Sequence, residues 1–371
     1  MRATVWTVAN ALGVVAGTPG ELLTALLSAP RRPDRVVLPA GTPGVGELAA
    51  DLRALGHVEV AFEEPERPVP PPGRPRLSDP AAVCAADPVR VTRLYEEETG
   101  PYGGLRAAWL RAGQALVRDG QTPPGRALAL LAALPEGAKE PVRDRLAALA
   151  ADAPWTVAGV REGRVTALTV CGGRPVETDD RRTRAVACLG DGTRLTLDER
   201  GRLRTSSGPA PRLVEAVAAT LAAHPATALA AVGDTVLTGD RMGFAHAFSL
   251  AGLHQAALHS GRVTALTATG GPRVYSGGAD GTVRLWRPGG EADDAPVVAR
   301  RPHPVAALHA WGAALAVAWA DGLVELRDPA GGGVPRPFRP GPAVRALALL
   351  PDGTLAVGTD ETCVLLRARP A

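Results

Sequence analysis

The strongest constraint on the fold is a repeated sequence, Gly-Arg-Val-Thr-Ala-Leu-Thr, which occurs at residues 163–169 and again at 261–267. Each copy is followed by a Gly-Gly pair, at 172–173 and 270–271. Chance is a poor explanation for such a match. We therefore expect a repeat architecture, in which each unit buries its apolar face against its neighbours.

Weaker matches extend the pattern. Residues 184–193 resemble 345–354, since both run from Arg-Ala to Asp-Gly-Thr, and a His-Pro pair occurs at 224–225 and at 303–304. The repeats place candidate innermost strands near residues 184, 226, 262, 305 and 344. Short β-rich runs with Gly and Asp turns at a period of about 40 residues are typical of β-propeller blades.

The clearest unit is residues 259–287, where positions 276–286 read Ser-Gly-Gly-Ala-Asp-Gly-Thr-Val-Arg-Leu-Trp. This unit closely resembles the core of a WD40 repeat. The resemblance implies that the family's hydrogen-bonded structural tetrad consists of His259, Ser276, Asp280 and Trp286. Buried polar groups of these types satisfy one another within a blade, so we interpret them as fold residues and not as a catalytic Ser-His-Asp set.

Other units depart from that pattern. The next one keeps His303 and Asp321 but has Val317 and Arg327 in place of the serine and the tryptophan. Residues 154–371 have room for about five recognisable blades at this period. Residues 155–160 are a candidate outer strand for closing the last blade, because a propeller must join its ends. The alternatives are worn blades hidden in the helical segment, or a ring completed by another chain.

Residues 1–62 are predicted to form a small α/β domain. We expect strands at residues 4–9, 13–16, 35–40 and 57–62, and helices at 21–28 and 47–55. The turn before the second helix is a candidate anion-binding loop, because free N–H groups at a helix start attract anions. Its residues are Gly41, Thr42, Gly44 and Gly46. The alternative is that glycine and proline only shape a tight connection here.

The middle of the chain contains a proline-rich range followed by a range with helical spacing. Residues 63–87 contain seven prolines and are expected to be an extended linker. Residues 88–153 are predicted to be a helical segment, with a helix start at Thr122. One helix face is formed by residues at helical spacing, namely Leu105, Trp109, Ala112 and Leu116.

Composition excludes several kinds of site. Lys139 is the only lysine beside 40 arginines and follows an alanine, which rules out a P-loop and a protein-kinase lysine. The cysteines show no C-x-x-C spacing and are interpreted as small buried hydrophobes in a reducing compartment: Cys84, Cys171, Cys188 and Cys363. We predict no metal and no cofactor.

Charge and hydropathy limit the partners. The formal net charge is only +3, and no basic stripe is evident, so nucleic acid is not an expected partner. No apolar run has the length of a membrane span. We expect a cytoplasmic protein that binds neither membranes nor nucleic acid.

These observations favour a noncatalytic interaction scaffold or sensor subunit that uses a WD40-like propeller to bind other proteins. Its expected class is mainly β, with the propeller preceded by a small α/β unit and a helical segment. The alternative is that the N-terminal α/β domain is a small-ligand- or nucleotide-binding enzyme or receptor, and that the propeller only targets it.

Overall fold

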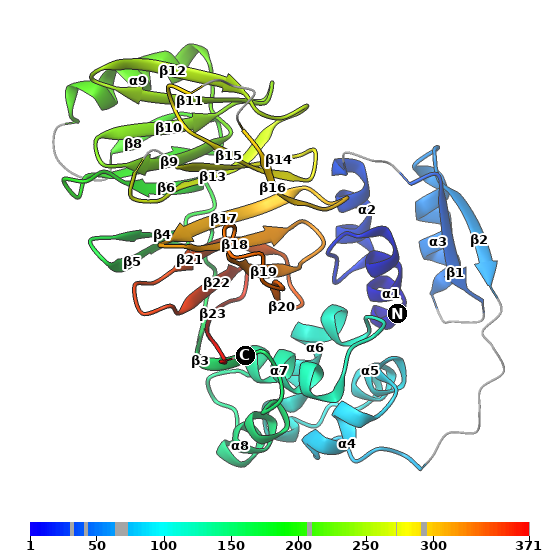
Figure 1. Ribbon diagram of the computed structural model, residues 1–371. Helices are drawn as coiled ribbons and strands as arrows, with labels where there is room; N and C mark the ends of the chain where they lie inside the picture. Colours follow the sequence, from blue (N-terminus) through cyan, green and yellow to red (C-terminus); the bar gives the residue numbers. More distant parts are fainter. Residues whose placement is uncertain are drawn as a thin grey trace. The chain divides into compact units, whose positions relative to one another are not determined.

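The computed structural model divides the chain into two compact units (Figure 1). One comprises residues 1–160 and 339–343, and the other residues 161–338 and 344–370. The structure describes residues 1–29, 33–40, 44–63, 73–205, 210–271, 273–290 and 295–370. Gly41 and Thr42, two members of the candidate anion-binding loop, lie outside these ranges.

The first unit begins with an α/β arrangement, as predicted. Strands β1 Arg35–Pro39 and β2 Glu59–Glu63 pair in parallel. Helices α2 Pro19–Ser28 and α3 Val45–Ala54 contribute Leu22 and Leu48 to the same buried cluster as the strands. The Thr18 hydroxyl accepts a hydrogen bond from the Glu21 N–H, and the Glu21 carboxylate accepts one from the Gly17 N–H, which fixes the start of α2.

The prediction of strands at residues 4–9 and 13–16 is wrong, because residues 2–12 form helix α1 Arg2–Leu12. Val5, Val8 and Ala9 recur at helical spacing and lie in the α/β core. Trp6 is buried against Gly113, where a Cβ would lie 2.0 Å from the indole. Packing on two sides overrides the β propensity of these valines and this tryptophan.

A group of helices completes this unit. The helices are α4 Pro80–Ala85, α5 Pro88–Glu97, η1 Tyr102–Gly104, α6 Leu105–Leu116, α7 Pro123–Ala133 and α8 Glu140–Leu149. Asp79, Asp87 and Thr122 each accept a backbone hydrogen bond at a helix start, and each is followed by proline. The predicted face of α6 is buried, and the predicted threonine caps the start of α7. Within the range expected to be a linker, residues 80–85 are helical, and residues 64–72 lie outside the described residues.

Strands dominate the rest of the chain, as predicted. They are β3 Trp155–Glu162, β4 Ala167–Cys171, β5 Arg174–Thr178, β6 Thr183–Cys188, β7 Arg194–Asp198, β8 Leu203–Thr205, β9 Ala228–Val232, β10 Thr235–Gly239, β11 Phe244–Ser249, β12 Gly252–Ala257, β13 Val263–Ala268, β14 Val274–Gly278, β15 Thr282–Trp286, β16 Val297–Arg300, β17 Val305–Trp311, β18 Ala314–Trp319, β19 Val324–Arg327, β20 Arg336–Phe338, β21 Val344–Leu349, β22 Leu355–Thr359 and β23 Thr362–Ala368. One further helix, α9 Arg212–Ala223, packs on β7 and β8 through Val214, Val217 and Leu221.

These strands form a β-propeller. Five blades of three or four strands are present among the described residues: β6-β7-β8, β9 to β12, β13 to β16, β17 to β20, and β21-β22-β23-β3. Their innermost strands begin at residues 183, 228, 263, 305 and 344, within two residues of the predicted positions. The two-stranded hairpin β4-β5 lies between the last blade and the first, since β4 contacts both β21 and β6.

The blades interlock through glycines in their second strands. A Cβ on Gly239 would lie 2.5 Å from Val263 of the next blade. The same relation holds between Gly277 and Val305 at 2.4 Å. Because a side chain at either glycine would displace the neighbouring valine, the glycines set the spacing between blades.

The same contact closes the ring. Gly358 of the last blade receives Val165, with a Cβ distance of 2.8 Å, and the Val165 N–H donates to the Thr359 carbonyl at 2.9 Å. Strand β3 pairs as the outer strand of the last blade, which confirms the closure predicted for residues 155–160. The ring therefore needs no blades from the helical segment.

Candidate functional site

A cavity of about 330 Å³ lies where the innermost strands meet. It is lined by β4, β6, β9, β13, β17 and β21, so hairpin β4-β5 contributes to the wall like a full blade. Each strand supplies an alanine at the same position: Ala167, Ala185, Ala228, Ala265, Ala307 and Ala346. We call this cavity the central channel, and its two ends are the start and the end of the inner strands.

Three members of the expected tetrad are in contact. His259 Nδ1 lies 3.1 Å from Asp280 Oδ1, and His259 Nε2 lies 3.0 Å from the Ser276 hydroxyl. Thr282, which the sequence analysis did not single out, joins this network, since its hydroxyl lies 3.1 Å from His259 Nδ1 and donates to Asp280. Trp286 is buried in an apolar cluster that this blade shares with the preceding one and that also contains Leu266 and Val274.

Electrostatics agree with a bracing role for this network. Burial lowers the pKa of His259, which favours the neutral imidazole. Burial alone would raise the pKa of Asp280, but hydrogen bonds from Thr282 and the nearby His259 hold it below its usual value. Ser276 has no exposed surface, so its hydroxyl is out of reach of a substrate. The set therefore ties the loop before β13 to the β14–β15 turn.

The next blade differs from the sequence interpretation, which placed His303 at the histidine position. Arg301 occupies that position instead, because its N–H donates to the Gly281 carbonyl as the His259 N–H donates to that of Gly243. The Arg301 guanidinium bonds Asp321 at 2.9 Å and lies 5.8 Å from the centre of the Trp319 ring. His303 Nε2 is 3.8 Å from Asp321 Oδ2.

A second polar group braces this blade from inside. The Trp319 indole N–H donates to Glu325 Oε2 at 2.8 Å, and Arg327 also donates to Glu325, at 3.0 Å. Glu325 is buried, and a buried carboxylate needs such partners. Sequence reasoning missed this group, because its signal is only an acidic residue two positions before an arginine in a strand.

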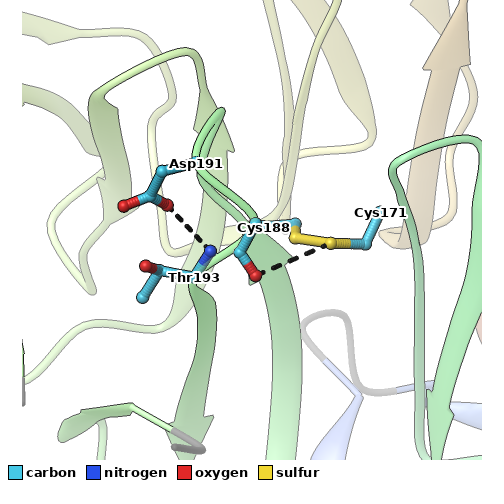
Figure 2. The surroundings of a disulfide bond; sticks show 5 residues. Cys171, Cys188, Asp191 and Thr193 are labelled. Carbon is cyan, nitrogen blue, oxygen red and sulfur yellow. Dashed lines mark hydrogen bonds between the residues drawn. A yellow bond between two sulfur atoms is a disulfide. The ribbon is translucent and has the colours of Figure 1, made fainter. Parts of the chain in front are cut away.

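A disulfide between Cys171 and Cys188 lies at the end of strands β4 and β6, beside the channel (Figure 2). The interpretation of all four cysteines as buried thiols is therefore wrong for these two, whereas Cys84 and Cys363 are buried and free. Burial raises the pKa of the Cys84 thiol to about 12. The sequence could not show that two inner strands 17 residues apart lie side by side. Cys171 and Cys188 therefore do not support the expectation of a reducing compartment, since disulfides are rare there.

In the turn between β6 and β7, which follows Cys188, a side chain bonds the backbone of the turn. The Asp191 carboxylate accepts a hydrogen bond from the Thr193 N–H at 2.8 Å, as Figure 2 shows. Trp311, at the end of β17, lines the same end of the channel and is 42% exposed. Such an exposed indole on a paired strand is the most prominent apolar feature of this end.

The N-terminal loop offers a less open site than the sequence suggested. Gly44 caps α3 with a φ of 79°, and a Cβ there would lie 1.9 Å from Met1 Cε. The side chain of Met1 therefore covers this glycine. Gly46 lies within the first turn of α3. Across the described parts of the chain, no group of three His, Cys, Asp or Glu side chains could hold a metal ion.

Comparisons with known proteins give no family. No protein-family model and no curated protein matches this sequence. Among solved structures, the chain is similar to the computationally designed proteins Ika8 (TM-score 0.38, 18% identity, 55% of this chain and 71% of that one) and Ika4 (0.34, 24%, 39% and 91%). It is also similar to the β-propeller domain of Cps50 (Swd1) from Myceliophteria thermophila (0.43, 14%, 58% and 100%). At these scores the assignment of the propeller stands on the sheet order itself. None of the described helices is long and apolar enough to cross a membrane.

Proposed function

We propose that this protein is a noncatalytic interaction scaffold or sensor subunit whose propeller, of the WD40 type, binds other proteins. The observation that supports it is Trp311, which is 42% exposed at the end of the central channel. Tryptophan is enriched among the residues that carry most of the energy of a protein interface. An exposed indole beside a concave opening is therefore a suitable anchor for a partner.

The frame around Trp311 supports the same proposal. Trp311 pairs with Ala314 across the β17–β18 turn, so the indole projects from an ordered strand. Interfaces built on rigid elements lose less conformational entropy on binding than interfaces built on mobile loops. The braced blades therefore serve as a platform, and their polar networks are already satisfied within the fold.

The test is quantitative affinity purification of the full-length chain from its native host, with wild type, Trp311→Ala and Leu250→Ala compared side by side. Leu250 is a matched control, because it is an exposed apolar residue on the β11–β12 turn and does not line the channel. We expect a discrete protein that wild type and Leu250→Ala retain and Trp311→Ala loses by at least about tenfold. Equal retention by all three chains, or no specific partner, would contradict the proposal.

A further inference from the structure

Three arginines gather at the end of the central channel opposite the disulfide, where the inner strands begin. Arg184 is the second residue of β6 and lines the channel. Arg262 directly precedes β13, and Arg241 lies in the β10–β11 turn. All three are exposed, and they belong to three consecutive blades. We call them the arginine cluster.

Backbone contacts hold Arg241 beside Arg262. The Val263 N–H donates to the Asp240 carbonyl at 3.0 Å, which joins the residues next to each arginine. The Gly243 carbonyl accepts the N–H groups of Leu258 and His259. Gly243 has a φ of 95°, and a Cβ there would lie 2.0 Å from the His259 carbonyl. The turn that carries Arg241 is therefore fixed against the segment that carries Arg262.

The carboxylate nearest to each arginine along the chain is already occupied. Asp180, four residues before Arg184, accepts hydrogen bonds from the Arg182 N–H and the Thr183 hydroxyl. Asp240 accepts the N–H groups of Met242 and Phe244 and contacts His246. Asp280 is bound to His259 and Thr282. Throughout the described chain, no acidic side chain forms an ion pair or hydrogen bond with any of the three arginines.

Other arginines of the propeller behave differently. Arg345, at the same strand position as Arg184, pairs with Asp360 at 2.6 Å, and Arg164 contacts the same carboxylate at 3.4 Å. Partial burial lowers the pKa of Arg262, and the charges of Arg184 and Arg241 lower it further. The cluster is thus a local excess of positive charge that the protein leaves uncompensated, and an anion bound there would relieve the repulsion.

We propose that the arginine cluster binds a short acidic segment of a partner protein, through carboxylates held by the guanidinium groups of Arg184, Arg241 and Arg262. This inference rests on the proposed function, for which it names the chemistry of a second contact surface. Guanidinium groups are planar, and each can hold a carboxylate by two parallel hydrogen bonds. Met242, which is 75% exposed beside Arg241, adds an apolar contact for the same segment.

The extent of the cluster favours a peptide over nucleic acid. Asp360 neutralises Arg164 and Arg345, so the positive area does not continue from the cluster onto hairpin β4-β5 and the last blade. Nucleic acid is bound along extended basic surfaces that neutralise several phosphates, usually with aromatic side chains that stack on bases. Neither Arg241 nor Arg262 has an aromatic residue within two positions in the sequence.

The test measures binding of the full-length chain to a fluorescent peptide of alternating Glu and Asp, by anisotropy at low ionic strength. We expect binding that weakens as salt rises, and a loss of at least about tenfold in affinity for the triple variant Arg184→Glu, Arg241→Glu, Arg262→Glu. The triple Arg→Lys variant should bind more weakly than wild type but more tightly than the Glu variant, because it keeps the charge and loses the paired hydrogen bonds of the guanidinium groups. Arg174→Glu is the matched control, since Arg174 is an exposed arginine at the start of β5, beside the disulfide end of the channel.

Equal binding by the wild type and the triple Glu variant, or no binding of the peptide, would overturn the inference. Tighter binding of a single-stranded oligonucleotide, or of inorganic phosphate, than of the peptide would overturn it in favour of those ligands. The peptide with Gln and Asn in place of its acids should not bind. Thermal unfolding of each variant shows whether it is folded. If partner capture depends on Trp311 but the peptide does not bind, the proposed function survives and this inference fails.

Discussion

Two neighbouring blades of the propeller have the same backbone and different internal chemistry. In blade β13 to β16, Val263 pairs with Gly278, and in blade β17 to β20, Val305 pairs with Trp319 at the same position. A Cβ on Gly278 would lie 2.3 Å from His259 Nδ1. The glycine therefore leaves room for the imidazole, whereas the second blade fills that position with an indole.

The comparison separates the contacts that both blades share from the side chains that only one of them has. In both blades, the residue four positions before the inner strand donates its N–H to a glycine carbonyl of the preceding blade, Gly243 for His259 and Gly281 for Arg301. The side chain at that position then reaches an aspartate, Asp280 or Asp321. The backbone link and the aspartate are shared, but the neutral imidazole of one blade is replaced by an arginine ion pair and an indole in the other.

The largest effect should come from removing the two buried indoles in turn. Trp319→Ala should lower the free energy of unfolding by about 4 to 6 kcal/mol, because it leaves a cavity and takes a hydrogen bond from the buried Glu325. Trp286→Ala should cost about 3 to 5 kcal/mol, since the contacts of Trp286 among the described residues are apolar packing. Urea unfolding of both variants checks this order. A loss below about 1 kcal/mol for Trp286→Ala would mean that the blade assignment is wrong.

A second difference between the two blades concerns how their stability depends on pH. His309 in β17 accepts a hydrogen bond from the Leu349 N–H, at the strand position where Thr267 in β13 accepts one from Ala310. Burial lowers the pKa of His309 from 6.5 to about 4. Between these values the unfolded chain binds a proton that the folded chain does not, so stability is complete above pH 6.5 and falls as the pH drops toward 4. The loss should reach about 3 kcal/mol.

The variant His309→Thr places the residue of one blade into the other. A threonine hydroxyl can accept the same hydrogen bond and does not titrate, so the variant should lose about 3 kcal/mol less than wild type over this pH interval. Urea unfolding at neutral pH and near pH 4 measures the difference. An unchanged acid sensitivity would assign the effect to other groups, such as His259, whose pKa is also lowered by burial.

The smallest effect tests only the network around His259. Ser276→Ala should cost about 1 to 2 kcal/mol, because it leaves a nitrogen of the buried His259 without a partner. The corresponding residue of the other blade is Val317, which is paired with Leu308 as Ser276 is with Leu266. Differential scanning calorimetry of Ser276→Ala and Val317→Ala would show whether the two losses have different pH dependence. Only the first should vary with pH through the histidine, and identical profiles would argue against the network.

The positions of the strands were predictable because the repeat fixes them. The repeated seven residues place Val165 and Val263 at equivalent points, and both fit against a glycine of the preceding blade. The first copy of the repeat, which contains the start of β4, was not among the predicted inner strands, and only 16 residues separate the starts of β4 and β6, which leaves room for a hairpin and not for a full blade. The period alone therefore could not show how the ring is filled.

The parts that sequence reasoning missed depend on contacts between segments far apart in the chain. Helix α1 was predicted as strands because its valines and tryptophan suit a sheet locally, whereas its burial on two sides is a property of the fold. Arg184, Arg241 and Arg262 form no stripe in the sequence and meet only because their blades adjoin. The sequence did mark His259, Ser276 and Asp280, because one repeat retains a recognisable motif.

The contact between Val165 and Gly358 determines how late in synthesis the ring can close. Val165 donates its N–H to Thr359, which follows it by 194 residues. At roughly 5 to 20 residues per second, the ribosome needs about 10 to 40 s to make that stretch. Throughout this interval the ring cannot close, and hairpin β4-β5 has no partner on the side where the last blade belongs. The nascent chain thus presents an uncovered apolar face, at which we expect chaperones to act.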